Sequence, residues 1–451
     1  MTQVIFSFDT EDYVNPNAAE GIMNSSKILR DAGITGCYNV VGLLAEALEE
    51  WGRYDIIEEL SKYHEISTHS HRHSMHPTIN EYSDLADAKA AIRAVIEDET
   101  KGIEKLCRIF DIPPESIVTA CPPGISTSYA AHYAYADMGL TIYDGDSIYD
   151  AKRSRPVYFC NMTALRYNIG VAKILLTADE DFIRNYVEKY VAPSDVFIFY
   201  HHPQLALCSG YCDVYNFNGV NTPKEDWILS PPRTPEETAT FYKNYKFLVE
   251  LIKNDERFNV TTYSELAKKY SSERIITPDM LPDIKRQLDE YFFPVTSPDS
   301  FCLSDILLAC RDFLQGKTAH RCEKVYGFTD TPYTATKEIT LSADEIRALA
   351  DSFRDGEFLP EVLFISDKHI SPADWLRAAL SLLVDGCETY TVKPGLPWQI
   401  DLDQFPDFRD TVYKDTWVHS KDFEDRYITN RGRLQTWTVR LPAHTPRKIF
   451  D

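Results

Sequence analysis

The feature that most constrains this fold is the regular alternation of short apolar segments with helical segments over residues 1–270. Residues 4–9 (VIFSFD) and 195–203 (DVFIFYHHP) have the length and composition of buried strands, whereas residues 81–110 have the spacing of a long amphipathic helix. Strict alternation of this kind predicts parallel strands joined by helical crossovers. About seven strands over this length favour a distorted (β/α) barrel of about seven parallel strands over a small open sheet.

The pattern changes after residue 272. Residues 273–300 are rich in Pro, Ser and Asp, which predicts a linker or wrapping segment. Residues 301–451 contain several amphipathic helical segments and an aromatic, Pro-containing tail. We therefore expect a barrel domain at 1–272, a connecting segment at 273–300, and a smaller, mainly helical accessory region at 301–451.

Charge and cysteine use exclude several classes of protein. The formal net charge is −22 and the isoelectric point is near 5.0, so the chain repels polyanions, and neither nucleic acid nor an anionic membrane is an expected partner. The sequence contains no uninterrupted apolar run of about 18 residues, the length that a membrane helix requires. The ten cysteines are scattered without a Cys-x-x-Cys pair, and the N-terminus lacks a basic leader pattern, which together predict reduced thiols and a cytoplasmic location.

Polar residues gather at the points where the predicted strands end, which is where (β/α) barrels carry their chemistry. The histidines His69 and His73 are four residues apart in EISTHSHRHSMHP, and two imidazoles with one carboxylate form a common catalytic zinc set. His71 and His76 are expected to point away or to line the loop. An isolated histidine pair at this spacing is weak evidence, so an ordinary surface cluster remains the alternative at this point.

The first predicted strand ends in SFDTED, which concentrates carboxylates where a divalent cation would neutralise them. The two-residue period of a strand places Asp9 and Glu11 on one side, so one can bind a metal while the other stays free as a base. A late strand ends in His201 and His202, of which one can act as a general acid and the other is expected in the core.

These motifs, SFDTED, HSHRH, PPG, YDGDS and FYHHP, occur in the order found in the polysaccharide deacetylases, which are carbohydrate esterase family four with the NodB-homology fold, and residues 1–270 resemble that family. The resemblance implies a metal-dependent hydrolase that removes an N-acetyl group from an amino sugar or oligosaccharide, with a metal-activated water attacking the amide carbonyl. The implied catalytic residues are Asp9 as base and His202 as general acid, with His201 as the fallback. The implied metal ligands are Glu11, His69 and His73. The expected substrate-binding residues are Pro122, Pro123, Gly124, Tyr143 and Asp144, with Tyr149 as a further aromatic.

The third motif departs from the family. The run TACPPG places Cys121 where the family has an arginine that orients the base, while the usual aspartate partner of that arginine is matched by Asp144. A cysteine cannot supply the fixed cationic fork of an arginine. Either another arginine fills the gap or the base is poorly held, and the candidate arginines are Arg153, Arg155 and Arg166.

Alternatives stay open for the substrate, the metal and the accessory region. The chain could instead hydrolyse a small non-sugar amide, such as an allantoin-like ureide or a formamide, or bind carbohydrate and metal without turnover. Zinc is the favoured divalent metal, with cobalt, nickel or manganese as alternatives. The accessory region weakly resembles small helical wall-binding repeats. The other interpretations are a cover for the barrel mouth or a contact between copies in a homo-oligomer.

Overall fold

The computed structural model describes residues 1–123, 128–145, 148, 154–165, 169–271, 273–401 and 418–442. Within these residues the chain forms two compact units. Unit 1 comprises Met1–Pro156, Met162–Tyr270 and a returning segment that ends at Ile428, and unit 2 comprises Val157–Asn161, the chain from Ser271 onward up to that segment, and the residues from Thr429. Residues 418–428 therefore pack with the barrel although they lie in the region predicted as accessory.

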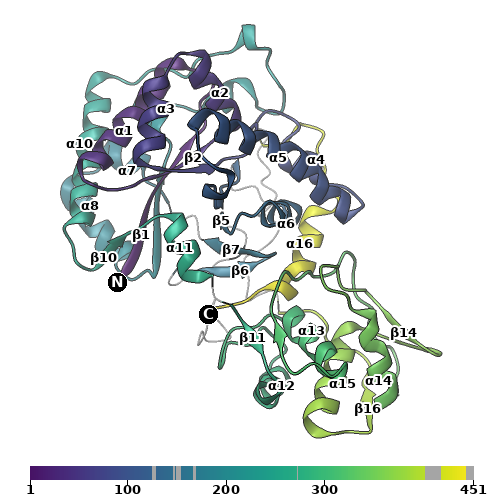
Figure 1. Ribbon diagram of the computed structural model, residues 1–451. Coiled ribbons are helices and arrows are strands. Elements are labelled where there is room, and N and C mark those ends of the chain that lie inside the picture. The colour runs from purple at the N-terminus through teal and green to yellow at the C-terminus, as the bar shows by residue number, and fades with distance from the viewer. Residues whose placement is uncertain are drawn as a thin grey trace. The chain divides into compact units, whose positions relative to one another are not determined.

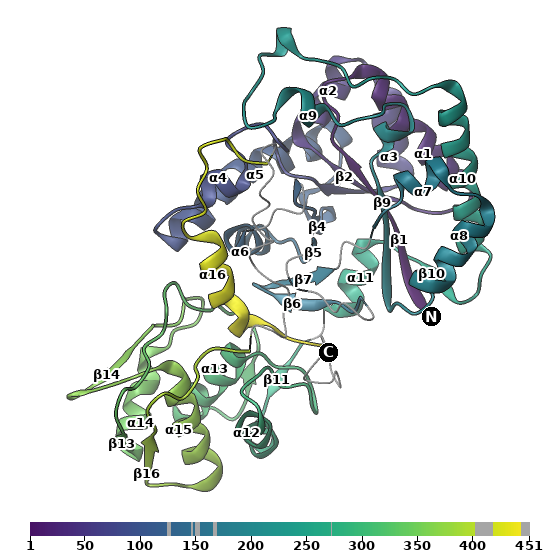
Figure 2. The same cartoon turned by 180° about the vertical axis from the view of Figure 1, so that it is seen from behind.

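Unit 1 is built around one parallel sheet (Figures 1 and 2). Its strands follow the order β7-β5-β4-β3-β2-β1-β9-β8, and β10 also pairs with β1. Every one of these pairings is parallel. The strand bounds are β1 Thr2–Thr10, β2 Cys37–Val40, β3 Glu65–Thr68, β4 Thr119–Ala120, β5 Ile142–Asp144, β7 Met162–Leu165, β8 Ile169–Gly170, β9 Val196–His201 and β10 Phe258–Val260.

Helices cover this sheet, and the predicted fold class, a barrel-like parallel α/β fold with a further helical region, is confirmed. The helices of unit 1 are α1 Ala19–Asp31, α2 Gly42–Glu50, α3 Tyr54–Tyr63, α4 Ile79–Ser83, α5 Ala88–Phe110, α6 Tyr129–Asp137, α7 Ala172–Thr177, α8 Glu180–Tyr186, α9 Cys212–Asn216, α10 Pro235–Lys253 and α11 Tyr263–Tyr270. Local sequence sets several of their ends. Asp87 caps α5 by accepting from the N–H of Ala90, and Thr234 and Glu237 form a capping box at α10.

The register of β1 decides where the chemistry lies. Asp9 is opposite Asn39 of β2, and Phe8 is opposite His201 of β9. The middle of β1 is buried on both faces, as expected for a central parallel strand that helices cover on each side. The carboxyl ends of β1, β2, β3 and β9 consequently meet at one edge of the sheet, where the polar motifs of the sequence follow.

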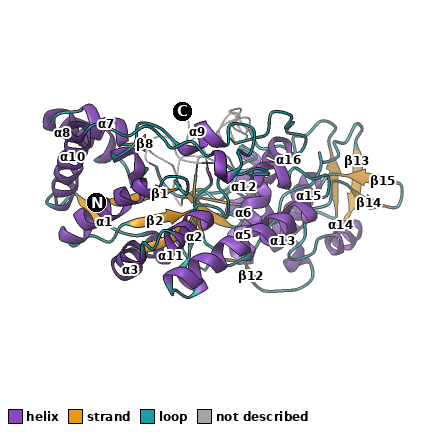
Figure 3. Ribbon diagram, turned by 90° about the horizontal axis from the view of Figure 1, so that it is seen from above, coloured by secondary structure: helices purple, strands orange, loops and turns teal. Residues whose placement is uncertain are grey.

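Unit 2 is smaller and combines helices with short two-stranded sheets, which the sequence pattern did not predict (Figures 1 and 3). Its helices are α12 Leu281–Glu290, α13 Leu303–Leu314, α14 Ala343–Leu349, α15 Pro372–Asp385 and α16 Ile428–Leu434. Its strands are β6 Val157–Phe159, β11 Ile275–Ile276, β12 His320–Arg321, β13 Ile339–Ser342, β14 Leu363–Ile365, β15 Lys368–Ile370 and β16 Thr389–Val392. Helix α12 lies inside the segment predicted as a linker. Trp375 of α15 is fully buried in this unit.

All ten cysteines are free thiols, and most of them are buried. Among the described residues, no helix combines the length and the apolar character that a membrane crossing requires.

Glu99 of α5 is a buried carboxyl inside unit 1. It accepts hydrogen bonds from the Tyr135 hydroxyl at 2.9 Å, the Tyr82 hydroxyl at 3.2 Å and the backbone N–H of His71 at 3.1 Å. Burial raises the pKa of Glu99 to about 7, although the bonds from Tyr135 and His71 oppose the shift. Its stabilising contribution is therefore fully present below an ordinary pKa of 4.5 and is lost as the pH rises through about 7.

We predict that Glu99→Gln, which keeps the shape and removes the ionisation, is more stable than the natural protein at pH 8. The difference in unfolding free energy between variant and natural protein should grow by roughly 2 to 3 kcal/mol between about pH 5 and pH 8. Urea unfolding at both pH values measures it. Glu97→Gln, an exposed position on the same helix, is the control and should track the natural protein. A constant difference for Glu99→Gln across this range would contradict the prediction.

Candidate metal centre and catalytic site

Three strand ends bring the predicted site residues together. Asp9 and Glu11 lie at and just beyond the end of β1, His69 and His73 follow β3, and His202 follows β9. Asp9, Glu11, His69 and His73 are each buried, whereas the side chain of His202 keeps 14% of its surface exposed. The parallel arrangement explains the convergence, since these strand ends share one edge of the sheet.

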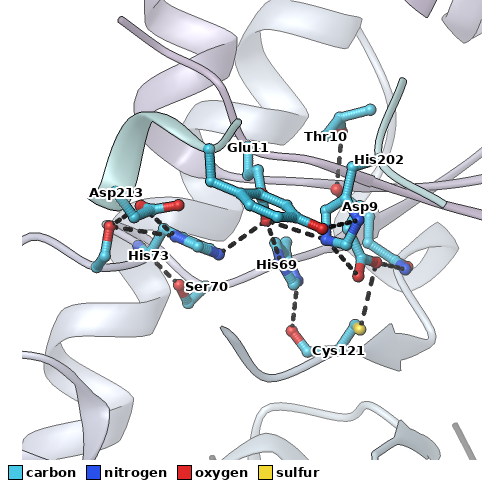
Figure 4. Close-up of polar contacts among 12 residues, drawn as sticks. Asp9, Thr10, Glu11, His69, Ser70, His73, Cys121, His202 and Asp213 are labelled. Carbon is cyan, nitrogen blue, oxygen red and sulfur yellow. Dashed lines mark hydrogen bonds and ion pairs between the residues drawn. The ribbon is translucent and has the colours of Figure 1, made fainter. Parts of the chain in front are cut away.

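The two histidines face the same carboxylate oxygen (Figure 4). Nε2 of His69 is 3.4 Å from Oε2 of Glu11, and Nε2 of His73 is 3.0 Å from the same atom. The potential ligand atoms of these three residues all lie within 4.8 Å of one another. This set of two imidazoles and one carboxylate, with room for a further ligand, is the donor set of many catalytic zinc sites.

Each imidazole is oriented through its other nitrogen. Nδ1 of His69 donates to the backbone carbonyl oxygen of Cys121 at 2.9 Å. Nδ1 of His73 donates to Oδ1 of Asp213 at 3.1 Å, and the Ser74 hydroxyl donates to the same oxygen. Metal-bound histidines usually have such partners, which fix the tautomer and leave Nε2 as the donor. The chemistry of the donor set therefore fits a divalent metal.

The electrostatic interactions of the metal set centre on the carboxylate of Glu11. Burial raises the pKa of Glu11, but the charges of His202 and His73 and hydrogen bonds from His69 and His73 outweigh it and hold the pKa well below the ordinary value. For His73, burial lowers the pKa, but Asp213 and Glu11 overcome this effect and raise it to about 10. The cluster thus favours an ionised carboxylate surrounded by positive charge, the arrangement that a cation would also stabilise.

The loop that carries the histidines is held in an unusual backbone conformation. Ser70 and His73 have φ values of 67° and 53°, which non-glycine residues seldom adopt. The Ser70 hydroxyl accepts from the N–H of His73 at 2.9 Å. Glycines allow two helices to approach this loop, because a Cβ on Gly102 would lie 2.9 Å from Cα of His71 and one on Gly42 would lie 3.0 Å from the His71 carbonyl oxygen.

Asp9 sits beside the metal set, held by neutral donors. Its Oδ1 accepts from the Asn39 side-chain amide at 2.9 Å and from the Cys121 thiol, whose sulfur is 3.6 Å away. Its Oδ2 is 3.6 Å from Nε2 of His202. Burial raises the pKa of the Cys121 thiol well above its ordinary value, and Asp9 raises it further, so Cys121 donates as a neutral thiol.

Asp144, the predicted partner of the missing arginine, is fully buried. The Tyr263 hydroxyl donates to Oδ2 of Asp144, and the oxygens of Tyr263 and Ser7 are 2.8 Å apart. The Asn39 amide, which also binds Asp9, donates to Ser7 at 3.0 Å. A chain of neutral groups therefore connects Asp144 to Asp9. Two of the arginines predicted as substitutes, Arg153 and Arg166, lie outside the described residues, and substitution by these or by Arg155 stays a prediction.

The two neighbouring histidines after β9 differ in environment. Nε2 of His202 is 3.6 Å from Oε2 of Glu11 as well as from Asp9, and its Nδ1 is 3.4 Å from the Tyr211 hydroxyl. When the ring is protonated, Nδ1 donates to this hydroxyl and the Nε2 proton faces the carboxylates. His201 instead packs in the core against Phe8, and burial lowers its pKa to about 3. His201 is therefore a neutral core residue and not a second acid at the site.

The structure describes some of the residues predicted for substrate binding and leaves others outside the described ranges. Pro122 and Pro123 are buried next to the metal loop, and Gly124 and Tyr149 lie outside the described residues. Tyr143 is fully buried and stacks on His132 at 3.7 Å between ring centroids, so its ring is not placed at the surface where it could pack on a sugar. The predicted contact of Tyr143 with substrate stays a prediction.

A small recess beside the metal set includes a residue from the far end of the chain. It has a volume of about 10 Å³ and is lined by His73, Thr78, Ile79, Asn80, Pro123 and Val418. The returning segment 418–428 is fixed to α4, because the Thr78 hydroxyl donates to the Val418 carbonyl oxygen at 2.7 Å and Glu81 accepts from the N–H of Ser420 at 2.6 Å. Asp84 accepts from the N–H of Tyr427 at 2.7 Å.

Sequence reasoning missed several residues of the site. Asp213 orients His73, Gln204 donates to Oε1 of Glu11 at 3.0 Å, and Tyr211 contacts His202. All three come from residues 203–216, which have no strand pattern. The one available indication was that this segment directly follows the FYHHP motif, so it must start at the site.

The fold of this chain is similar to that of several solved structures at low sequence identity. A polysaccharide deacetylase from Mycobacterium smegmatis matches with a TM-score of 0.40 and 15% identity over 59% of this chain and 89% of that chain. A family 4 carbohydrate esterase from Streptomyces lividans matches with a TM-score of 0.32 and 11% identity over 58% of this chain and 92% of that chain. A 4-alpha-glucanotransferase from Thermococcus litoralis matches with a TM-score of 0.42 and 11% identity, over 64% of this chain and 46% of that chain.

No family model matches the chain, and no curated protein matches its sequence. The similar structures carry different activities in their names, and one fold commonly serves several chemistries. The function is therefore derived from the site residues.

We predict that Gly102→Ala weakens metal binding and lowers stability. Alanine favours a helix over glycine by about 1 kcal/mol, but here its Cβ would press on the backbone of His71 and shift the loop that carries the ligands. Zinc titration and thermal unfolding measure the two effects. Unchanged metal affinity together with a raised melting temperature would show that the close approach does not matter.

We predict that Asp213→Asn lowers metal affinity about 10- to 100-fold, because Asn keeps the size but removes the charge that orients His73. Competition with a coloured chelator measures the affinity, and circular dichroism checks the fold. Asp226→Asn, an exposed position in the same segment, is the matched control and should bind metal normally. Equal affinities for the two variants would contradict the role of Asp213.

Proposed function

We propose that this protein is a metal-dependent hydrolase that removes an N-acetyl group from an amino sugar or oligosaccharide. The observation that carries the proposal is the convergence of three groups on one edge of the sheet: the metal set Glu11, His69 and His73, the carboxylate of Asp9, and Nε2 of His202. A metal set alone would fit a structural site, but an acid–base pair beside it is what hydrolysis of an amide requires.

Glu11, His69 and His73 would hold one divalent metal, with zinc favoured by the two imidazoles. When bound, such a metal polarises a carbonyl oxygen and lowers the pKa of water. Because His69 and His73 are fixed through Nδ1 by Cys121 and Asp213, their Nε2 atoms keep their direction. This orientation is set before any substrate arrives.

Asp9 is the proposed general base, which takes a proton from the attacking water. Asn39 and Cys121 hold its Oδ1, so Oδ2 is the oxygen on the His202 side that exchanges the proton. In its protonated form His202 is the proposed general acid, which gives the Nε2 proton to the departing nitrogen as the carbon–nitrogen bond breaks and is left as a neutral imidazole. The products are then acetate and the free amine. The partial exposure of His202 agrees with a group that reaches the substrate.

The recess beside His73 offers a place where the methyl of an acetyl group would lie. Ile79, Pro123 and Val418 supply apolar surface there.

A second candidate is hydrolysis of a small non-sugar amide. The thiol of Cys121 beside Asp9 favours it, because the base is held by neutral donors where the resembled family uses an arginine. Free thiols at all ten cysteines fit a reducing compartment, where such metabolites occur, and the cytoplasmic location stays a proposal.

We predict that the zinc-loaded protein releases acetate from N-acetylglucosamine oligomers and that Asp9→Asn lowers kcat by about 100-fold or more while metal content is unchanged. Asp9 is outside the metal set, so the variant separates proton transfer from metal binding. Acetate assays with metal analysis measure both quantities. The absence of acetate release from sugars, together with ammonia or formate release from ureides or formamides, would favour the second candidate.

His69→Ala is the complementary variant and should lose the bound metal, because one of three ligands is removed. Elemental analysis of the purified protein measures the stoichiometry. An unchanged stoichiometry would refute the metal assignment. If the natural protein binds metal but turns over no amide, the result would instead indicate a binding protein.

A further inference from the structure

Unit 2 contains a cavity of about 500 Å³ that has no part in the proposed hydrolysis. Its polar lining includes Arg311 and Asp312 of α13, Lys317 after that helix, and His320 and Arg321 of β12. Helix α13 is visible in Figure 1 and β12 in Figure 3. A volume of this size is typical of sites for small molecules.

One buried carboxylate, Asp312, organises the cluster. Arg311 donates to its Oδ1 through Nε at 2.9 Å and Nη2 at 2.6 Å, and Lys317 donates to the same oxygen at 3.0 Å. His320 donates from Nδ1 to Oδ2 at 2.8 Å. Burial raises the pKa of Asp312, but these bonds outweigh burial and hold its pKa below the ordinary value. Both carboxylate oxygens of Asp312 thus accept hydrogen bonds from protein groups.

The other ring nitrogen of His320 is different. Only 5% of His320 is exposed, and within the described part of the chain its Nε2 has no hydrogen-bond partner. A buried polar atom without a partner is costly and rare in native proteins, and it calls for a ligand or water. His320 lines the cavity but its Nε2 is covered by protein atoms, so the side chains that offer donors to a bound molecule are Arg311 and Lys317.

The charge of the lining is also unusual for this chain. Its cationic members Arg311, Lys317, Arg321 and Lys324 outnumber its carboxylates Asp312, Glu323 and Asp355, in a protein whose net charge is −22. Two of its carboxylates are already engaged, since Nη2 of Arg311 contacts Asp312 at 2.6 Å and Asp355 at 2.7 Å. Nη1 of Arg311 has an acceptor in the Phe353 carbonyl oxygen at 3.4 Å and carries a second proton for a ligand.

We propose that this cavity binds a small organic anion through its phosphate or carboxylate group. Arg311 and Lys317 would contact the anionic group, and Arg321, which also pairs with Glu273 at 2.8 Å, would add to the attraction at the rim. Hydrogen bonds between ionised groups and such anions are the strong ones, and a buried setting increases them.

Other ligand classes fit less well. A metal ion would need the Asp312 carboxylate, which three protein donors already occupy. The described residues that line the cavity include no Phe, Tyr or Trp, so a nucleobase or sugar ring would lack a large aromatic surface for stacking. The proposal does not depend on the hydrolase function, because every residue that it uses belongs to unit 2.

The test is calorimetric titration of the full-length protein at low ionic strength with inorganic phosphate and, separately, with citrate. We expect at least one of the two to bind. Lys317→Gln should weaken that binding about tenfold or more, since one charge-assisted hydrogen bond is lost. Arg321→Gln should weaken it by a smaller factor. Both side chains are more than half exposed, so neither variant should disturb folding.

Lys337→Gln is the matched control, an exposed lysine of the same unit that does not line the cavity, and it should bind like the natural protein. Binding of phosphate alone identifies a phosphate site, and binding of citrate alone identifies a carboxylate site. No binding of either anion at millimolar concentration overturns the proposal. Binding that Lys317→Gln and Arg321→Gln leave unchanged, or that Lys337→Gln weakens equally, also overturns it.

Discussion

The buried carboxylate of Glu11 is the group on which the site depends. It lies just beyond the central strand, and four side chains direct polar atoms at it: His69, His73, His202 and Gln204. A carboxylate removed from water is costly unless it is neutralised, so the surrounding loops must supply positive charge and hydrogen-bond donors. A cation shared with the two imidazoles satisfies the same requirement, which explains how one arrangement serves both stability and chemistry.

The conformation of the histidine loop follows from this constraint. His73 contacts Glu11 from a position with positive φ, and glycines at 42 and 102 let two helices lie against His71 in the same loop. Glu99 holds the loop from behind by accepting the N–H of His71. The backbone strain at His73 is thus offset by the contacts that His71 makes in the same loop.

The contacts of Cys121 bear on how Asp9 is held. The sequence predicts that Cys121 occupies the place of the arginine in the resembled family, and the structure puts its thiol against Asp9. Neutral donors from Asn39, Ser7 and Tyr263 then connect Asp9 to Asp144. Within the described residues, this network orients the Asp9 carboxylate through hydrogen bonds that begin at Asp144.

The sequence by itself determined the parallel α/β architecture, because apolar strands alternating with amphipathic helices have few other ways to bury their faces. It also placed Asp9, Glu11, His69, His73 and His202 at strand ends, since the two-residue and four-residue spacings lie within single motifs. It could not find Asp213, which is 140 residues from His73, or Val418, which reaches the recess from the end of the chain. It named Tyr143 for substrate contact but could not show that this ring stacks on His132. The cavity in unit 2 likewise depends on α13, β12 and the residues around Asp355 meeting in space. Local spacing fixes which residues share one strand or loop, but contacts between distant segments depend on the packing of the whole core, which only the tertiary structure decides.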